Sequence, residues 1–247
     1  MSGHSKWSTI KRKKGVADAK RASMFTKIGR EISVAVKAGG ADPSSNSKLR
    51  DLIAKAKANN VPNDNIDRII KKANNEGDKD NYEEIVYEGY GPSGVAVIVE
   101  TLTDNRNRTA GDIRHYFDKY GGNMGQSGCV SYMFDKKGVI LIDNEEGELD
   151  EDKVMEDCME AGAEDVDFGE EGEIEILTAP NDFSVVREAL EAKGYKFASA
   201  QVEMVPSTMT AIADDELRKK MAKMLDIMED NDDVQNIWHN WENPIEE

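Results

Sequence analysis

The sequence has few of the residues that support disulfide-rich, metal-binding or membrane-spanning proteins. Among 247 residues there are 2 cysteines and 3 histidines, and neither Cys129 nor Cys158 lies in a C-x-x-C pair. This usage does not support a disulfide framework, and the histidines are too far apart for a typical zinc-ligand spacing. No apolar run approaches the roughly 18 residues that a membrane span needs, and the N-terminus lacks the apolar core of a signal peptide. We therefore expect a cytoplasmic protein without a membrane segment, a metal or another cofactor.

The sequence also lacks the motifs of common enzymes. The glycine-rich segment 121–128 fits neither the P-loop pattern nor the G-x-G-x-x-G pattern of dinucleotide sites. No Ser-His-Asp or Cys-His set has supporting local context. The acidic runs 143–152 and 226–233 lack the glycine-centred spacing of a calcium-binding loop, and we interpret them as solvated faces. We expect no catalytic residues and no small-molecule substrate.

Positive charge is outnumbered by negative charge overall, with 32 Lys+Arg against 49 Asp+Glu, but it is concentrated at one end of the chain. The formal net charge is −17. Residues 1–72 hold 17 Lys+Arg and 6 Asp+Glu, a balance of +11, whereas residues 73–247 hold 15 and 43, a balance of −28. A separation of this size is typical of a protein with a nucleic-acid-binding end and an acidic body that keeps it soluble.

Hydrophobic periodicity predicts helices in the N-terminal third. Apolar residues recur at three- and four-residue steps between residues 16 and 75, with interruptions at Gly39-Gly40 and around Pro62. Residues 1–80 are therefore predicted to form a basic helical domain.

Beyond residue 80 the pattern changes to strands and mixed elements. Two β-branched runs around 84–88 and 95–100 predict a hairpin, 106–120 predicts a helix, 121–128 a flexible loop and 129–134 a strand. A helix with the methionine-rich stripe 221–228 and an aromatic strand at 234–242 end the chain, and a lone strand needs a sheet to join. We predict a discontinuous α/β middle domain formed by residues 81–133 and 207–247.

The intervening segment, residues 134–206, has the element order β-α-β-β-α-β, which indicates a ferredoxin-like fold. It is the most acidic part of the chain, with 6 Lys+Arg and 22 Asp+Glu. The predicted fold class is therefore α+β with three domains, namely an N-terminal helical domain, a discontinuous α/β middle domain and an acidic ferredoxin-like domain.

The N-terminal segment carries the strongest candidate nucleic-acid-binding site. Cations on an irregular tail and a helix neutralise phosphates and release counterions, and a tryptophan among them can stack on an unpaired base. The alternative is a solvated basic face. The candidate residues are His4, Lys6, Trp7, Lys11, Arg12, Lys13, Lys14, Lys20, Arg21, Lys27 and Arg30.

A second candidate lies at the predicted start of the helix 106–120. Arg106, Asn107 and Arg108 follow a strand, and helix N-termini favour anions such as phosphate. Arg114, two helical turns further on, extends this surface. An Asp104 cap alone is the competing explanation of the motif. For the loop 121–128, contact with RNA and a plain long turn both remain open.

Long motifs are spread over the whole chain, in the segments 2–7, 18–21, 25–27, 30–32, 87–92, 103–109, 121–128 and 229–234, together with Lys11, Lys14, Pro62, Asn65 and Ile66. They resemble the motifs of the YebC/PmpR family, which includes the mitochondrial translational activator of cytochrome c oxidase subunit I. Two departures are small: Arg12 stands where the family commonly has histidine, and Cys129 stands where serine is common. The resemblance implies a three-domain α/β protein without a cofactor. It also implies a function as a DNA-binding transcriptional regulator or as a ribosome-associated translation factor that relieves stalling, notably at proline-rich stretches.

The sequence therefore predicts a non-enzymatic, nucleic-acid-binding regulator of gene expression. We favour translation, with the ribosome (rRNA or tRNA) as partner, because no helix-turn-helix dimer is recognisable and a basic tail with a tryptophan suits irregular RNA. Binding of promoter DNA by the same surface is the alternative. A nucleic-acid hydrolase is a third hypothesis, which lacks a paired-carboxylate or histidine site.

Overall fold

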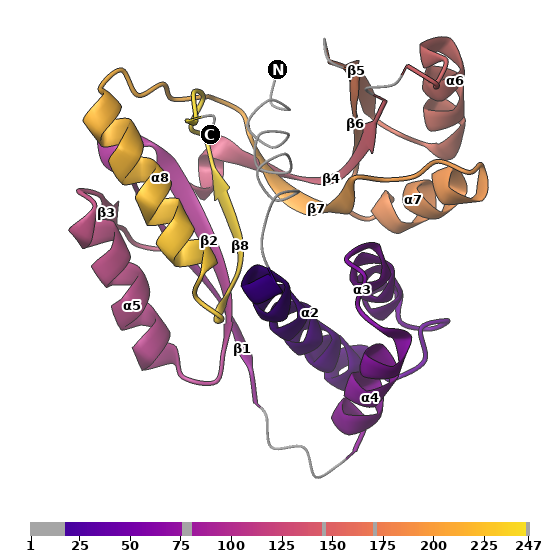
Figure 1. The fold of residues 1–247 in the computed structure, drawn as a ribbon, viewed down its shortest axis with the longest axis horizontal. Coiled ribbons are helices and arrows are strands. Elements are labelled where there is room, and N and C mark those ends of the chain that lie inside the picture. Colours follow the sequence, from indigo (N-terminus) through magenta and orange to yellow (C-terminus); the bar gives the residue numbers. More distant parts are fainter. Residues whose placement is uncertain (1–17, 76–80, 145–146, 170–171, 246–247) are drawn as a thin grey trace. The chain divides into compact units, whose positions relative to one another are not determined.

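The fold is α+β with three domains, as the sequence predicts (Figure 1). The computed structural model describes residues 18–75, 81–144, 147–169 and 172–245, without the side chains of residues 18–22. Two compact units are present. One is Asp135–Val205, and the other combines the N-terminal helices with the chain up to Phe134 and from Pro206 onwards.

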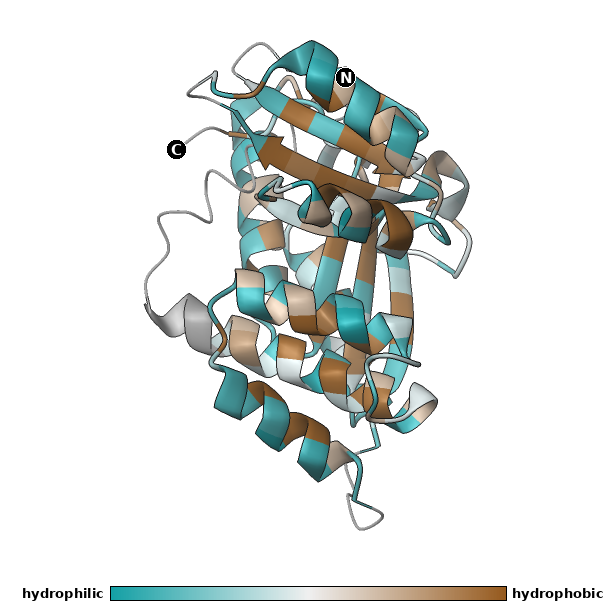
Figure 2. Cartoon of the chain, turned by 90° about the vertical axis from the view of Figure 1, so that its right-hand side faces the viewer, coloured by the Kyte–Doolittle hydropathy of each residue, from teal (hydrophilic) through white to brown (hydrophobic). Residues whose placement is uncertain are grey.

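Three helices form the N-terminal domain around a small apolar core. They are α2 (Asp18–Gly39), α3 (Ser47–Ala58) and α4 (Asn63–Ala73). The apolar stripe of α2, with Ile28, Ile32 and Val36, is buried against residues of α3 and α4 such as Leu49 and Ile66. Hydrophobic residues recur along one side of these helices, and hydrophilic residues cover the remainder (Figure 2). The helical period in the sequence thus translates directly into a core.

Asn46 fixes the junction between α2 and α3. Its side chain accepts a hydrogen bond from the Leu49 amide (3.0 Å) and donates to the carbonyl oxygens of Ala35 and Gly40 (both 2.9 Å). α2 ends at Gly39, and Gly40 has a φ of 87°, a left-handed conformation that suits glycine. One side chain therefore satisfies backbone groups at the end of one helix and the start of the next.

The middle domain contains an antiparallel sheet in the order β3-β1-β2-β8. The strands are β1 (Glu83–Tyr90), β2 (Ala96–Thr103), β3 (Asn123–Met124) and β8 (Val234–His239), and a single turn of 3₁₀ helix, η1 (Pro92–Gly94), joins β1 to β2. β8 pairs with β2, for example at Val99 and Ile237. The C-terminal strand thus joins this sheet, as expected. Trp241 lies beyond the strand and is buried.

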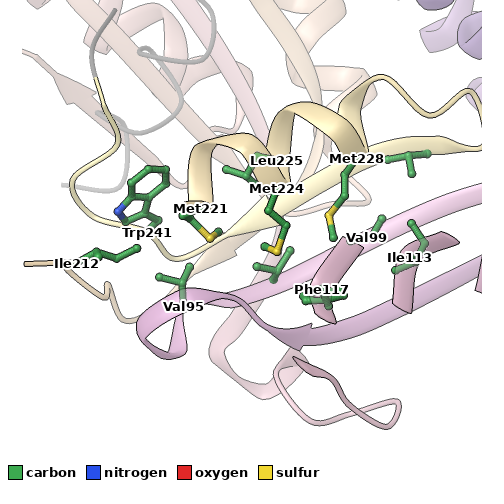
Figure 3. Packing of buried hydrophobic residues seen from close by; sticks show 12 residues of the cluster. Val95, Val99, Ile113, Phe117, Ile212, Met221, Met224, Leu225, Met228 and Trp241 are labelled. Carbon is green, nitrogen blue, oxygen red and sulfur yellow. The ribbon is translucent and has the colours of Figure 1, made fainter. Parts of the chain in front are cut away.

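Helices α5 (Arg106–Lys119) and α8 (Asp215–Glu229) share a core with this sheet. Met221, Met224 and Met228 of α8 point towards β2 and α5, where they meet Val99 and Phe117 (Figure 3). All three methionines are fully buried, which confirms that the methionine stripe is helix core.

The ferredoxin-like prediction for the acidic domain is confirmed. Its elements are β4 (Phe134–Asp143), α6 (Glu151–Ala161), β5 (Asp165–Phe168), β6 (Glu173–Thr178), α7 (Phe183–Ala192) and β7 (Ser199–Pro206). The sheet order is β5-β6-β4-β7. The two central strands, β4 and β6, are the first and third strands of this domain along the chain. A separate core beneath α6 and α7 includes Ile140, Cys158 and Leu190.

The segment after α5 differs from the prediction. Residues 121–128 are not simply a flexible loop, because Asn123 and Met124 form β3 and pair with Tyr90 and Gly89. Residues 129–134 are not a strand: a 3₁₀ turn, η2, occupies Ser131–Met133, and β4 begins at Phe134. The physical reason is the carboxylate of Glu88, which accepts hydrogen bonds from the amides of Gly128, Val130 and Ser131, as described below.

Gly111 provides a test of the helix α5. An added Cβ at this interior position meets no atom within 4 Å. Glycine in a helix interior costs about 1 kcal/mol relative to alanine, so we expect Gly111→Ala to raise the free energy of unfolding by about that amount. Thermal denaturation followed by circular dichroism should show the midpoint rising by about 2–4 °C.

The matched control for this prediction is Gly122→Ala. A Cβ at Gly122 would lie 2.5 Å from the carbonyl oxygen of Tyr90, so this variant should be destabilised although the substitution is identical. A lower midpoint for Gly111→Ala would contradict the open environment assigned to that position.

Candidate nucleic-acid interface

The structure describes only part of the predicted interface. His4, Lys6, Trp7, Lys11, Arg12, Lys13 and Lys14 lie outside the described residues, and Lys20 and Arg21 belong to α2 without described side chains. The remaining candidates are Lys27 and Arg30 on α2, and Arg106, Asn107, Arg108 and Arg114 on α5. These six residues fall into two groups, one bonded within the protein and one exposed to solvent.

Arg30 and Arg108 converge on the carboxylate of Asp233. Arg30 Nη1 donates to Asp233 Oδ1 at 2.9 Å, and Arg108 Nη2 donates to Oδ2 at 2.7 Å. The hydroxyls of Thr103 and Thr109 also donate to Oδ2, at 3.2 and 2.8 Å. Asp233 is only 4% exposed. Its carboxylate therefore receives one charge-assisted hydrogen bond from the helical domain, through Arg30, and one from within the middle domain, through Arg108.

Further contacts attach the same face of α2 to the acidic turn 229–233. Lys27 Nζ donates to the carbonyl oxygen of Glu229 at 2.5 Å, and the Ser23 hydroxyl donates to Asp232 at 3.0 Å. Arg30 also donates to the Asp232 carbonyl oxygen at 2.8 Å, and its guanidinium lies 5.3 Å from the ring centre of Tyr82. These bonds explain why the helical and middle domains form one compact unit.

The electrostatics of this cluster favour the ionised carboxylate. Burial raises the pKa of Asp233, but the hydrogen bonds from Arg108, Thr109 and Arg30 outweigh burial, so its pKa lies below the ordinary value. The bond to Asp233, with a smaller contribution from Asp104, raises the pKa of Arg108. Arg108 thus lies between two carboxylates, the buried one of Asp233 and the exposed one of Asp104, and Arg30 shares the first of them.

The start of α5 presents a second, open environment. Its N-cap is Asn105, whose side chain accepts a hydrogen bond from the Arg108 amide at 3.1 Å. The predicted Asp104 cap is therefore wrong, and Asp104 pairs with the Arg108 side chain at 2.9 Å. Arg106 and Asn107 are exposed in the first turn. Within the described structure neither side chain makes a hydrogen bond or ion pair, so both are available to an anion at the helix N-terminus.

Arg114 and His115 continue the exposed side of α5. Within the described residues Arg114 also lacks an ion pair or hydrogen bond. Of the six described candidates, Arg106, Asn107 and Arg114 are thus open to solvent, whereas Lys27, Arg30 and Arg108 are engaged within the protein.

Glu88 on β1 holds the glycine-rich segment in place. Its Oε1 accepts a hydrogen bond from the Gly128 amide (2.7 Å), and its Oε2 accepts bonds from the amides of Val130 (2.9 Å) and Ser131 (2.8 Å). Burial raises the pKa of Glu88, but these bonds outweigh burial and lower it overall. Amides of an extended strand point alternately to opposite sides, so three of them converge on one carboxylate only if the backbone turns.

Two features important for this surface were missed by sequence reasoning. The run 226–233 is interpreted from sequence as a solvated face, which is wrong for Asp233 because its carboxylate is buried. The role of Glu88 depends on contacts 40 to 43 residues away in the chain. Both are acidic residues inside long motifs, at 229–234 and 87–92, and that position is the one signal in the sequence that could have drawn attention to them.

Other kinds of site find little support in the described residues. Within them, no group of three or more His, Cys, Asp and Glu side chains is placed to hold a metal ion. Among the same residues no helix is both long enough and apolar enough to cross a membrane. What the surface offers chemically is hydrogen-bond donors and positive charge for an anionic partner.

Comparison with known proteins assigns the family. A model described as the TACO1/YebC protein N-terminal domain matches residues 5–76, and one described as the TACO1/YebC second and third domain matches residues 82–241. A protein of Ruminiclostridium cellulolyticum is 63% identical over 242 residues, which cover 98% of this chain and 97% of the relative. A protein of Acetivibrio thermocellus is 60% identical over 241 residues, covering 98% and 99%. Both carry the name "Probable transcriptional regulatory protein".

A solved structure supports the same assignment. The crystal structure of a conserved hypothetical protein from Aquifex aeolicus is similar with a TM-score of 0.82 and 45% sequence identity, over 93% of each chain. The two family matches together span most of the chain, and the long motifs at 87–92, 103–109 and 229–234 fall within the second. The chain therefore belongs to the TACO1/YebC family, which is the YebC/PmpR family that its motifs resemble.

Proposed function

We propose that this protein is a non-enzymatic regulator of gene expression that binds RNA on the ribosome and acts on translation. The separation of charge carries the proposal, because a balance of +11 in residues 1–72 faces −28 in the remainder. A polyanion is repelled by most of such a molecule and attracted to one end, which orients the encounter. The partner would be rRNA or tRNA, and relief of stalling, for example at proline-rich stretches, would be the activity.

The geometry of α4 argues for RNA over a DNA duplex. α3 and α4 are joined by the short segment 59–62, so α4 would be the recognition helix if the pair bound DNA as a helix-turn-helix. A recognition helix contacts bases with its N-terminal residues. In α4 that part carries exposed Asp64 and Asp67, and its cations Arg68, Lys71 and Lys72 come later. Carboxylates at the leading end would repel the phosphates that line a groove.

Transcriptional regulation through promoter DNA is the second candidate. The names of the relatives from Ruminiclostridium cellulolyticum and Acetivibrio thermocellus favour it. The same exposed residues, Arg106, Asn107 and Arg114, would then contact DNA phosphates. The acidic body would confine the duplex to one edge of the protein.

Ribosome profiling of a deletion strain, paired with transcript quantification, separates the two candidates. Ribosome stalls at defined codons with unchanged mRNA levels would support translation. Changed transcript levels with unchanged ribosome occupancy per transcript would rule translation out and support transcription. Co-sedimentation of the purified protein with ribosomes is the direct test of the partner.

Replacing Lys11, Arg12, Lys13 and Lys14 together with alanine should weaken binding to single-stranded RNA. Each lost phosphate contact should reduce the steepness of the plot of log affinity against log salt by about 0.7. Fluorescence anisotropy across a salt series measures both quantities. Unchanged affinity and slope would show that these residues do not contact the nucleic acid.

The matched control neutralises four exposed lysines elsewhere, namely Lys196, Lys219, Lys220 and Lys223. This variant loses the same charge from the acidic part of the chain. Equal weakening by both variants would show that net charge, and not the N-terminal segment, determines affinity.

A further inference from the structure

Tyr132 is the most exposed large hydrophobic residue of the described chain. Its exposed fraction is 74%, against 66% for Val185 and 46% for Val86. It lies in η2, directly after the glycine-rich segment. The side chains that surround it along the chain do not form an apolar patch, because Gln126, Ser127 and Gly128 are also exposed and Val130 is buried.

The backbone that leads into Tyr132 is fixed by hydrogen bonds. The amides of Gly128, Val130 and Ser131 donate to Glu88, and the Tyr90 hydroxyl donates to the Cys129 carbonyl oxygen at 3.0 Å. A hydrogen bond between the side chains of Tyr90 and Tyr132 raises the pKa of Tyr90. The ring is therefore presented to solvent from a rigid support, which reduces the entropy lost when it binds a partner.

The charge around Tyr132 suits a polyanion. Residues 119–134 contain no Asp or Glu, which makes them the longest stretch without a carboxylate between residues 73 and 247. The nearest carboxylate on β1 is that of Glu88, which is 5% exposed and is compensated by three amide donors. The segment itself therefore contributes no carboxylate that would repel phosphate, and Asp118 and Asp135 mark its two ends.

We propose that Tyr132 is a stacking platform for an unpaired base of single-stranded RNA. This inference rests on the proposed function and specifies the part of the ligand that the middle domain recognises. A flat aromatic ring binds the face of any base, and exposed Gln126 and Ser127 offer hydrogen bonds to base edges. A protein partner would require a wider apolar surface around the ring than these polar neighbours provide.

Binding of the full chain to a fluorescein-labelled, unstructured RNA of about 12 nucleotides tests the proposal. Tyr132→Ala should weaken binding by about 5- to 150-fold, the usual range for loss of one stacked base. Tyr132→Phe, which keeps the ring, should stay within about twofold of the wild type. The salt slope should be the same for all three proteins because no phosphate contact is lost. When the same RNA is annealed to its complement, the wild type and both Tyr132 variants should bind it with equal affinity, because no base is unpaired.

Val185→Ala is the matched control, since it truncates another highly exposed apolar side chain in a different domain. Unchanged affinity of Tyr132→Ala would overturn the proposal, and so would a loss in Tyr132→Phe as large as that in Tyr132→Ala. In either case the wild type still binds RNA and the proposed function survives. If the wild type binds neither RNA nor ribosomes, both the function and this inference fail.

Discussion

Asp233→Ala should lower the free energy of unfolding by about 3 kcal/mol, although the residue sits in an acidic turn next to solvent. Breaking a buried ion pair from one side costs about 3–5 kcal/mol because the other charge stays behind. The lower end applies here because the side chain of Arg108 is 46% exposed and water can replace part of the lost interaction. The substitution also removes an acceptor that the buried hydroxyls of Thr103 and Thr109 share. Urea denaturation measures the change.

Asp230→Ala is the matched control, because Asp230 is exposed in the same turn and carries the same charge. This variant should stay within about 0.5 kcal/mol of the wild type. A similar loss in both variants would mean that the net charge of the turn, and not the buried carboxylate, is what stabilises the fold.

The lowered pKa of Asp233 gives this interaction a defined pH dependence. Because the folded pKa lies below the unfolded value, the unfolded state binds the proton first as the pH falls. The stabilisation is therefore present above the ordinary value of 3.8 and is lost as the pH falls through the lower, folded pKa. Removal of Asp233 should consequently flatten the acid limb of the stability curve.

Asp233 also matters for the proposed function, because the two arginines that it binds belong to different domains. Arg30 belongs to the helical domain and Arg108 to the middle domain, so one carboxylate sets the spacing between the basic helix and the start of α5. Faster amide exchange in α2 and in the first turn of α5 should accompany the loss of stability in Asp233→Ala. Arg30 and Arg108 were expected to bind nucleic acid, and their bonds give them this additional structural role.

Local patterns in the sequence predicted most of the elements correctly. The α2 stripe, the β1–β2 hairpin and the methionine stripe of α8 each bury the residues that their periodicity indicates. These are short-range signals, set by the geometry of one helix or one strand. The β-α-β-β-α-β order likewise implied the sheet order of the acidic domain, because the ferredoxin-like arrangement follows from the sequence of elements.

The errors arose where a distant side chain determines the local backbone. Residues 129–134 contain apolar and aromatic side chains typical of a strand, yet η2 forms because Glu88 binds the amides of Val130 and Ser131. Asp104 has good cap chemistry, yet Asn105 takes that position while Asp104 pairs with Arg108. A buried acidic residue cannot be distinguished from a solvated one by its own sequence neighbourhood.

Glu88→Ala should be more damaging than Asp233→Ala, with a loss of about 4 kcal/mol in the free energy of unfolding. Each amide left without an acceptor costs about 1–3 kcal/mol when buried, and Glu88 binds three. Water entering the vacated space reduces the total below the sum. Glu88→Gln keeps one acceptor oxygen, so its loss in the free energy of unfolding should be about half that of Glu88→Ala. The remaining loss arises because the amide nitrogen of the glutamine faces a backbone N–H donor. Glu84→Ala, which removes an exposed glutamate from the same strand, should change stability by less than about 0.5 kcal/mol.

The substitution at Glu88 also connects stability with recognition. If the carboxylate fixes the loop, exchange of the Gly128, Val130 and Ser131 amides should accelerate more in Glu88→Gln than exchange in β2. RNA binding should then weaken in Glu88→Gln as it does in Tyr132→Ala, since an unsupported ring loses its preorganisation. The two losses should not add in the double variant, because both act on one ring. If the two losses in RNA affinity add fully, Glu88 stabilises the fold without positioning Tyr132. If a folded Glu88→Gln variant binds RNA normally, the Tyr132 ring needs no rigid support.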